Sequence, residues 1–225
     1  MGIKMAVIEY FFENSDKILE YTLAHLYLIS ISIILSLILW VSVGIIIRNR
    51  EKTAKSLLGF GSLIMSVPSV SLYGILMTLP AFGLNMRSAI FALVLYSMIP
   101  IVRNVYTSLN EVDPAILESA KGMGMTEKQI LWKVQLPMAM PVIIAGIRVA
   151  LVMMVGIATL AVFIGERNLG QLIYQGIVRT KTEMIVTGAI LISLISIIVD
   201  IMMEILKRIL VSPGLLKEDS AGEGK

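Results

Sequence analysis

The stretch that decides the fold runs from residue 111 to residue 137 and reads EVDPAILESAKGMGMTEKQILWKVQLP. It is the only long charge-rich segment away from the N-terminus, and apolar stretches of membrane length flank it on both sides. A chain that is mostly soluble in lipid has little reason to hold a compact, partly apolar element in water unless a partner docks on it. We therefore interpret this stretch as the surface through which another protein acts on the membrane part.

The residues of this stretch predict two short helices joined by a tight turn. Asp113-Pro114 is a favourable helix start, because an acceptor side chain can cap the first turn and proline fits the first helical position. Gly122 and Gly124 can end this helix. Thr126 to Gln129 then has the spacing of a capping box, which opens the second helix. Leu136-Pro137 is expected to close it.

The first of these helices is predicted to have two different sides. Helical periodicity places Ile116, Ala120 and Met123 on one side, with Glu118 and Lys121 turned away from it. Periodicity alone leaves a second interpretation open, in which an ordinary amphipathic helix lies on the bilayer surface.

A spaced motif within the stretch favours the docking interpretation. Glu118-Ser119-Ala120 is followed after three residues by Gly124, after nine more by Val134, and then by one residue and Leu136-Pro137. This pattern resembles the EAA motif of ABC-importer permeases, E-A-A-x3-G-x9-I-x-L-P. Ser119 replaces the second residue of that motif, and Val134 replaces its isoleucine.

The resemblance implies a cytoplasmic coupling helix that is seated in a cleft of a separate ATP-binding subunit. It extends over about residues 55–210, where LYSMIPIVRNVYTSL and LPMAMPVIIAGIRVA look like the permeases of importers for glycine betaine, carnitine and choline. The fold it implies is the all-α, type I ABC-importer permease fold. The ATPase-coupling residues would be Asp113, Ile116, Glu118, Ser119, Ala120, Gly122, Met123, Gly124, Leu136 and Pro137.

The composition indicates a multi-pass membrane protein. The chain has 225 residues, of which 57% are hydrophobic and 16% charged, with a mean hydropathy of +0.87. These values lie far outside the range of soluble domains. The chain contains no cysteine, which excludes disulfides, thiolate metal sites and cysteine nucleophiles.

Five apolar segments predict about five transmembrane helices, with the coupling helix between the third and the fourth. The segments cover about residues 22–47, 57–82, 88–102, 138–165 and 183–206. In the second, Pro68 and several glycines and serines suit close packing and a local break. The third is short, so the run past Pro100 must contribute to it.

The ends of the chain are predicted to lie outside the permease domain, which we assign to residues 22–210. Residues 1–21 do not resemble a signal peptide, because acidic residues interrupt any apolar core. We interpret them as an interfacial helix with Phe11 and Phe12 toward lipid, with an irregular tail as the alternative. Residues 211–225 form a polar C-terminal tail.

The distribution of lysine and arginine predicts the orientation. With the N-terminus outside, residues 48–55, 103–133 and 207–225 face inward and hold 12 Lys and Arg, whereas the outer segments hold 6. Positive charge accumulates on the cytoplasmic side of membrane proteins. The docking stretch and the C-terminus are therefore expected in the cytoplasm of a cell whose plasma or inner membrane holds the chain.

No motif in the chain predicts an enzyme or a bound cofactor. Gly122-Met123-Gly124 lacks the spacing of a phosphate-binding loop, so ATP and Mg²⁺ are expected in a partner ATPase. No metal site is expected. His25 is the only histidine and is interpreted as a residue of the membrane interface.

Two charged residues within the predicted spans require partners, because unpaired charge in a membrane is unfavourable. Arg148 is expected to pair with Glu111 or Glu118, with a polar cavity as the alternative. Asp200 is expected to pair with Lys207 or with a lipid headgroup.

A quaternary ammonium cargo would suit an aromatic cage. The aromatic candidates are Trp40, Tyr73, Tyr96 and Phe163, and with Arg148 the last three are our candidates for the substrate path. In the resembled importers, however, the recognition cage belongs mainly to the external binding protein. That family usually reads G-A-G-G-L-G in an outer loop, where this chain has Gly165 and Gly170 around polar residues.

The sequence thus predicts a permease subunit of an ATP-driven importer for quaternary-amine osmoprotectants. The expected partners are ATPase subunits, a second permease copy or homologue, an extracellular solute-binding protein and membrane lipid, with no nucleic acid. Methionine or another amino acid remains open as cargo, and a small ion channel is the alternative from another class. A channel would explain the helices but not the capped, motif-bearing stretch.

Overall fold

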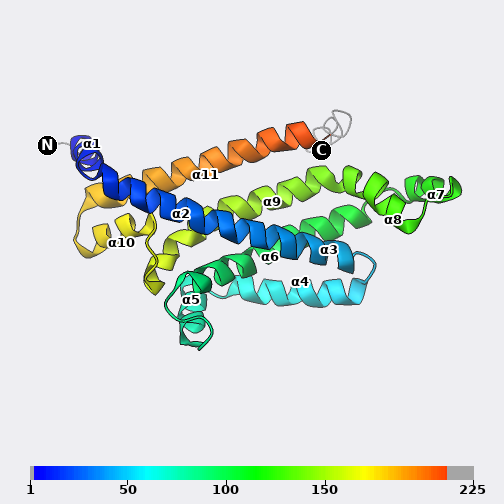
Figure 1. The fold of residues 1–225 in the computed structure, drawn as a ribbon, viewed down its shortest axis with the longest axis horizontal. Coiled ribbons are helices and arrows are strands. Elements are labelled where there is room, and N and C mark those ends of the chain that lie inside the picture. Colours follow the sequence, from blue (N-terminus) through cyan, green and yellow to red (C-terminus); the bar gives the residue numbers. More distant parts are fainter. Residues whose placement is uncertain (1–2, 212–225) are drawn as a thin grey trace.

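The protein is described here by a computed structural model of residues 3–211, and that part of the chain is built from helices and connecting turns (Figure 1). In chain order, the elements are α1 (Ile3–Glu13), α2 (Ser15–Ser36), the π-helical turn η1 (Leu37–Val41), α3 (Ser42–Ile47), α4 (Glu51–Ser66), α5 (Ser69–Thr78), α6 (Met86–Asn110), α7 (Pro114–Gly122), α8 (Glu127–Ile130), the π-helical turn η2 (Leu131–Gln135), α9 (Leu136–Ala158), the 3-10 helix η3 (Thr159–Ile164), α10 (Gly170–Val178) and α11 (Thr182–Leu210). The all-α prediction is confirmed for these residues.

Within residues 3–211, four helical runs are long and apolar enough to cross a bilayer, and a bent pair provides a fifth candidate. The four runs are Ser15–Ile47, Met86–Asn110, Glu127–Ile164 and Thr182–Leu210. The fifth candidate is α4 with α5, whose axes meet at 98°. The predicted count of about five spans agrees with this result. Each of the four long runs has more residues than the segment predicted for it.

The break between α4 and α5 follows from Pro68. Proline has no backbone N–H and disfavours a helical conformation in the residue before it. Val67 accordingly has φ −74° and ψ 128°, and Pro68 precedes the first residue of α5. The Tyr96 hydroxyl donates a hydrogen bond to the Val67 carbonyl at 2.6 Å. This bond satisfies an acceptor that the break removes from the helical ladder, as a membrane interior requires.

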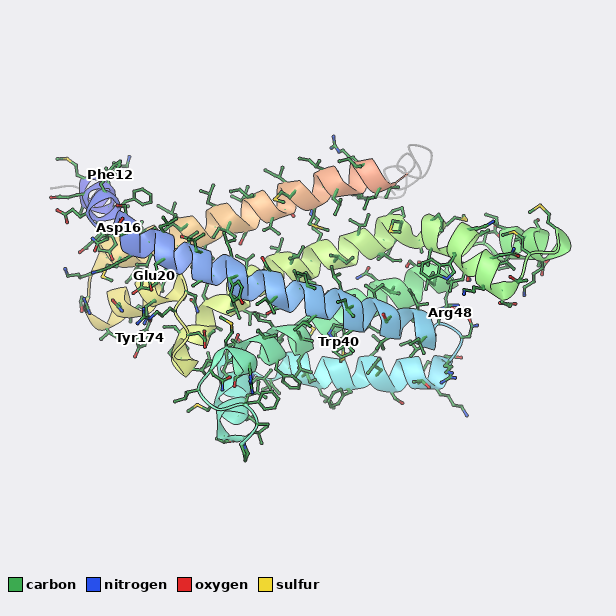
Figure 2. All side chains as sticks on the ribbon, in the orientation of Figure 1. Phe12, Asp16, Glu20, Trp40, Arg48 and Tyr174 are labelled. Carbon is green, nitrogen blue, oxygen red and sulfur yellow. The ribbon has the colours of Figure 1, made fainter. Side chains whose placement is uncertain are left out.

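Helix α6 forms the centre of the bundle, packing against α2, α4 and α9. In the most apolar 18-residue part of α6, 72% of the residues are buried. Trp40 in η1 lies against α6 (Figure 2), and its indole N–H donates to the Val94 carbonyl at 2.7 Å. α6 continues through Pro100 to Asn110, so the predicted contribution of the run past Pro100 is confirmed.

The N-terminal residues are helical, which excludes the irregular tail for α1. Phe11 and Phe12 are exposed, as expected of residues that face lipid. α2 starts at Ser15, seven residues before the predicted start of the first span, and Asp16 lies in its first turn. His25 is fully buried between helices of the bundle, and its position at the depth of the membrane interface stays a prediction. The predicted C-terminal tail lies outside the described residues, apart from Val211.

The sequence did not predict α10, which lies in the segment between α9 and α11. The loop before α10 is flanked by Gly165 and Gly170, and neither position accommodates a side chain without strain or a clash. Gly165 has φ +86°, a left-handed conformation that favours glycine. A Cβ on Gly170 would clash with the Thr159 carbonyl. Arg167 in this loop pairs with Glu20 of α2 at 3.0 Å, which links the loop to the first span.

α6 and α9 approach each other closely at Gly146, and this predicts a destabilising substitution. A Cβ at Gly146 would lie 2.5 Å from the Pro100 carbonyl oxygen and 2.6 Å from the Asn104 Cβ, so the helices must separate. Gly146→Ala should lower stability by about 1–3 kcal/mol, measured by unfolding in detergent. Gly156→Ala is the matched control on α9, because a Cβ there meets nothing within 4 Å. Equal stability of the two variants would contradict this packing.

Candidate functional site

The stretch singled out in the sequence forms a compact element at one end of the molecule. Figure 1 shows α7 and α8 projecting past the ends of α3 and α4 at the edge of the bundle. We call residues 113–135, which comprise α7, α8 and η2, the coupling element. The coupling element follows α6 and precedes α9 in the chain, so it connects two spans.

The start of α7 has the predicted capping geometry. The Asp113 carboxylate accepts a hydrogen bond from the Ala115 backbone N–H at 2.8 Å, and Pro114 occupies the first turn. The carboxylate satisfies a donor that would otherwise have no partner at the helix start. Asp113 therefore fixes the start of α7 while its side chain remains exposed, and its role in binding a partner stays a prediction.

The end of α7 requires a glycine at position 124. Gly124 has φ +79°. Its N–H donates to the Lys121 carbonyl at 2.9 Å, and the Met125 N–H donates to the Ala120 carbonyl at 3.2 Å. These two bonds form a Schellman motif, in which a left-handed residue reverses the chain after a helix. The glycine of the sequence motif thus has a conformational role here.

The start of α8 is the predicted capping box. The Gln129 N–H donates to the Thr126 hydroxyl at 3.3 Å, and the Thr126 N–H donates to the Gln129 side-chain oxygen at 2.8 Å. Lys121 and Glu127 approach to 3.7 Å across the turn between the two helices. The turn is therefore defined on both sides by local hydrogen bonds.

The second helix does not end at Leu136-Pro137, and that prediction is wrong. α8, η2 and α9 form one continuous run, and with η3 this run extends from Glu127 to Ile164. Pro137 lies in the first turn of α9, directly after the π-helical turn η2. Proline has no backbone N–H to donate within the helix. The π-helical turn η2 shifts the backbone hydrogen bonds directly before Pro137, so the helix continues past it.

The continuous run connects the coupling element mechanically to the membrane. Its 38 residues span roughly 57 Å at 1.5 Å per residue, whereas a bilayer hydrocarbon core is about 30 Å thick. A helix of this length must extend beyond the apolar layer. Gln135 also donates to the Leu109 carbonyl of α6 at 3.5 Å, which ties the base of the coupling element to the neighbouring span.

The coupling element exposes large apolar side chains. Met123 is 75% exposed, Trp132 60% and Ile116 37%. Glu118 and Ser119 are also exposed, whereas Ala120 is buried within the chain. Exposed apolar side chains beside a charged one are typical of an interaction site. The sequence interpretation missed Trp132, although the residue was visible within the same stretch.

Three further residues proposed for coupling have different surroundings. Leu136 belongs to the hydrophobic core of the bundle, and Pro137 is exposed at the start of α9. Gly122 has ordinary helical geometry, and a Cβ there would meet nothing within 4 Å. Leu136 therefore contributes to packing, while no contact within the described residues 3–211 explains a glycine at position 122.

Arg148 pairs with α11 and not with the coupling element, so the predicted partners Glu111 and Glu118 are wrong. Its guanidinium contacts the Asp200 carboxylate at 2.5 and 2.6 Å and donates to Glu204 at 2.8 Å. The predicted pairing of Asp200 with Lys207 or a headgroup is likewise replaced by this bidentate contact. Asp200 and Glu204 lie one helical turn apart, so α11 presents both carboxylates to α9.

The aromatic candidates do not converge on a cage within the described chain. Tyr73 is buried, and its hydroxyl lies 3.4 Å from the Ile157 carbonyl. Tyr96 and Trp40 make the interhelical hydrogen bonds described above, and Phe163 packs edge-on against Tyr174 with ring centroids 5.6 Å apart. Three of the four therefore connect helices, which is a structural use of their polar atoms.

Residues 3–211 contain no group of three or more His, Cys, Asp or Glu side chains arranged to hold a metal ion. What the coupling element offers is a shaped, partly apolar surface on a long helix.

Comparison with known proteins places the chain in a functional context. The model of the family described as "Binding-protein-dependent transport system inner membrane component" matches residues 40–211. The osmoprotectant import permease protein OsmW of Salmonella typhimurium is 36% identical over 214 residues, covering 94% of this chain and 100% of that protein. The glycine betaine/carnitine/choline transport system permease protein OpuCB of Bacillus subtilis is 35% identical over 202 residues, covering 90% and 92%.

A solved structure shows the same fold. A chain of the MetNI methionine ABC transporter, in an inward-facing conformation, superposes with a TM-score of 0.79 at 19% sequence identity. The match covers 89% of this chain and 99% of that chain. At this identity the likeness concerns the fold alone.

The Schellman motif predicts a specific effect of changing Gly124. Gly124→Ala forces a side chain into the left-handed region, at about 1–2 kcal/mol. The amide of Met125, which closes the motif, should then exchange roughly tenfold faster in hydrogen–deuterium exchange. Gly122→Ala is the control, because position 122 is helical and unobstructed, and its exchange should be unchanged or slower. Unchanged protection of Met125 in Gly124→Ala would contradict the motif.

Proposed function

This chain belongs to the family of binding-protein-dependent transport system inner membrane components, and we propose that it carries quaternary-amine osmoprotectants such as glycine betaine, carnitine or choline. It is a multi-pass membrane protein and a permease subunit of an ABC importer, which implies ATPase subunits and a second permease copy. The cargo proposal rests on relatives of 35–36% identity that match the chain over at least 90% of its length and are named for these solutes.

The coupling element is proposed to bind the ATPase subunit. Its exposed Met123, Ile116 and Trp132 supply apolar contact area, and Glu118 supplies a charge. Nucleotide that binds one state of the ATPase pair more tightly would shift the position of this element. Because α8 continues into α9, such a shift would move a membrane span as a rigid body.

The substrate path is proposed to lie between two copies of the permease. Up to four further spans surround the central, mostly buried α6, and we expect so few helices to be unable to form both a polar path and a lipid-facing shell in one copy. A symmetric pair can form such a path at its interface. Tyr73, Tyr96, Phe163 and Arg148 remain candidates to line it, although the first two and Arg148 already make interhelical contacts.

The orientation and the outer partners are also proposals. The excess of lysine and arginine supports a cytoplasmic coupling element, with the N-terminus outside and the C-terminus inside. An extracellular solute-binding protein would deliver the cargo to the loops around α10. ATP and Mg²⁺ would be bound by the partner ATPase and not by this chain.

Transport in cells tests this function. Cells without their own osmoprotectant importers, supplied with this chain and its ATPase and binding protein, should accumulate labelled glycine betaine, carnitine or choline. Exchange of the binding protein should change the cargo. Accumulation of methionine alone would contradict the cargo proposal, and ion conduction by the chain alone in liposomes would favour a channel.

A charge reversal in the coupling element supplies the control for this experiment. Glu118→Lys should abolish uptake and co-purification of the ATPase, while the amount of chain in the membrane stays unchanged. Glu51→Lys, which reverses an exposed acid at the start of α4, should retain both. Normal uptake by cells that carry Glu118→Lys would contradict the proposal that the coupling element binds the ATPase.

A further inference from the structure

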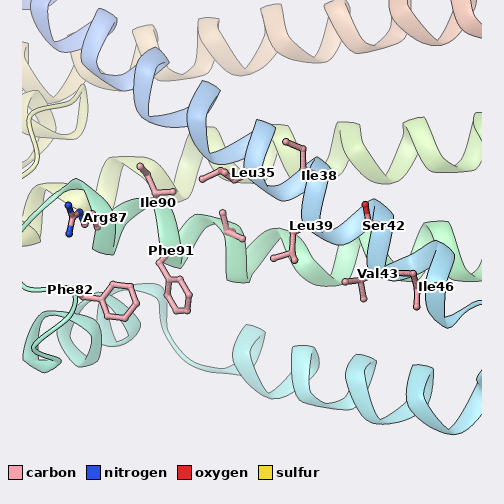
Figure 3. Close-up of a pocket in the computed structure, with 11 residues that line it drawn as sticks. Leu35, Ile38, Leu39, Ser42, Val43, Ile46, Phe82, Arg87, Ile90 and Phe91 are labelled. Atoms are coloured by element: carbon pink, nitrogen blue, oxygen red, sulfur yellow. The ribbon is translucent and has the colours of Figure 1, made fainter.

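An apolar groove of about 760 Å³ runs along the outside of the bundle (Figure 3). One wall is the run α2–η1–α3, and the other is the first half of α6 together with Phe82. The large aliphatic side chains of the first wall remain exposed, with Ile38 at 66% and Ile46 at 63%. We call this feature the α2–α6 groove.

The groove results from two departures from regular helix packing. The axes of α4 and α5 meet at 98° at Pro68, and no residue of either helix lines the groove. At η1 the buried Trp40 binds the Val94 carbonyl, which holds the wall against α6, while Leu39 beside it faces the groove. The groove is therefore fixed by hydrogen-bonded structure and is not a loose gap.

The dimensions of the α2–α6 groove match a lipid chain. Its first wall extends from Leu35 to Ile46, eleven residues apart. At a rise of roughly 1.5 Å per residue this is about 16 Å, close to half of a hydrocarbon core of about 30 Å. A groove of this length within a membrane span lies alongside the acyl chains of one leaflet.

A single charged side chain lies among the lining residues. Arg87 is exposed at the start of α6, beyond Ile90 and at the end of the groove marked by Phe82 (Figure 3). Among residues 3–211, no carboxylate forms a salt bridge with its guanidinium. The N-terminus of a helix adds further positive potential at this position. An apolar channel that ends at a cation is complementary to an acyl chain attached to a phosphate.

We propose that the α2–α6 groove binds one anionic phospholipid, with an acyl chain along the groove and its phosphate at Arg87. Burial of apolar surface gives no preference among lipids, because any acyl chain supplies the same contact. Selectivity therefore depends on the charge at Arg87. A lipid with a net negative headgroup is favoured over a zwitterionic lipid, whose own ammonium group competes for the phosphate.

The other occupant that could cover an apolar groove is the second permease copy. A copy seated in the groove would exclude lipid of either kind. The lone cation at the end of the groove favours lipid, since a lipid phosphate supplies the opposite charge that the described chain does not.

Trp40 provides a local reporter for the experiment. The chain has two tryptophans, and Trp132 lies in the coupling element, so Trp132→Phe leaves the indole beside the groove as the only one. The full chain is reconstituted in phosphatidylcholine vesicles that contain increasing fractions of brominated phosphatidylglycerol or brominated phosphatidylcholine. Bromine quenches indole fluorescence only at short range, so quenching measures lipid in the groove.

Brominated phosphatidylglycerol should reach half-maximal quenching at a roughly fivefold lower fraction than brominated phosphatidylcholine, since one arginine at a lipid surface contributes about 1 kcal/mol. Arg87→Gln should remove this preference, and high salt should reduce it in the unmodified groove. Arg103→Gln, an exposed arginine further along α6, is the control and should keep the preference.

Three results would overturn the proposal. The first is equal quenching by the two lipids, which would indicate unselective lipid contact. The second is a preference that survives Arg87→Gln, which would place the anion site elsewhere. The third is protection of Trp40 from both lipids, which would assign the groove to a second copy of the chain.

Discussion

The unbroken helix from Glu127 to Ile164 is the constraint on which the rest of the structure depends. It joins a capped, solvent-exposed surface to the α9 span through η2, where a π-helical turn carries the backbone past Pro137. A flexible loop at this point would let the surface move without moving the span. Because the helix continues, we expect a force on α7 and α8 to be transmitted to α9. Through the close approach of Gly146 to Pro100, we expect it to reach the central α6.

The interior of a membrane permits helix breaks and charges only where the chain satisfies them. At the break beside Pro68, the Tyr96 hydroxyl donates to the Val67 carbonyl, and the Trp40 indole of η1 donates to the Val94 carbonyl of α6. Arg148 is neutralised by Asp200 and Glu204, which connect α9 to α11. The same α9 that carries the coupling element is thus fixed to its neighbours on two sides, by close packing against α6 and by ion pairs to α11.

Local sequence rules predicted those parts of the molecule that local chemistry determines. The cap at Asp113, the turn at Gly124 and the capping box at Thr126 all depend on residues a few positions apart, and all are confirmed. Features that depend on distant residues were missed. The partners of Arg148 lie more than 50 residues away in the chain, and the passage through Pro137 depends on a π-helical turn that no residue pattern marks. Helix α10 was missed because its short, glycine-flanked segment looks like a loop. The roles of the individual coupling residues remain predictions.

The proposed function requires that the coupling element faces the cytoplasm and binds the ATPase. The chain has no cysteine, so Ser119→Cys introduces a single thiol on an exposed position of α7. A membrane-impermeant thiol reagent should fail to label this residue in intact cells, should label it in inverted membrane vesicles, and should be blocked there by the bound ATPase subunit. Labelling from outside intact cells would reverse the topology and contradict the account.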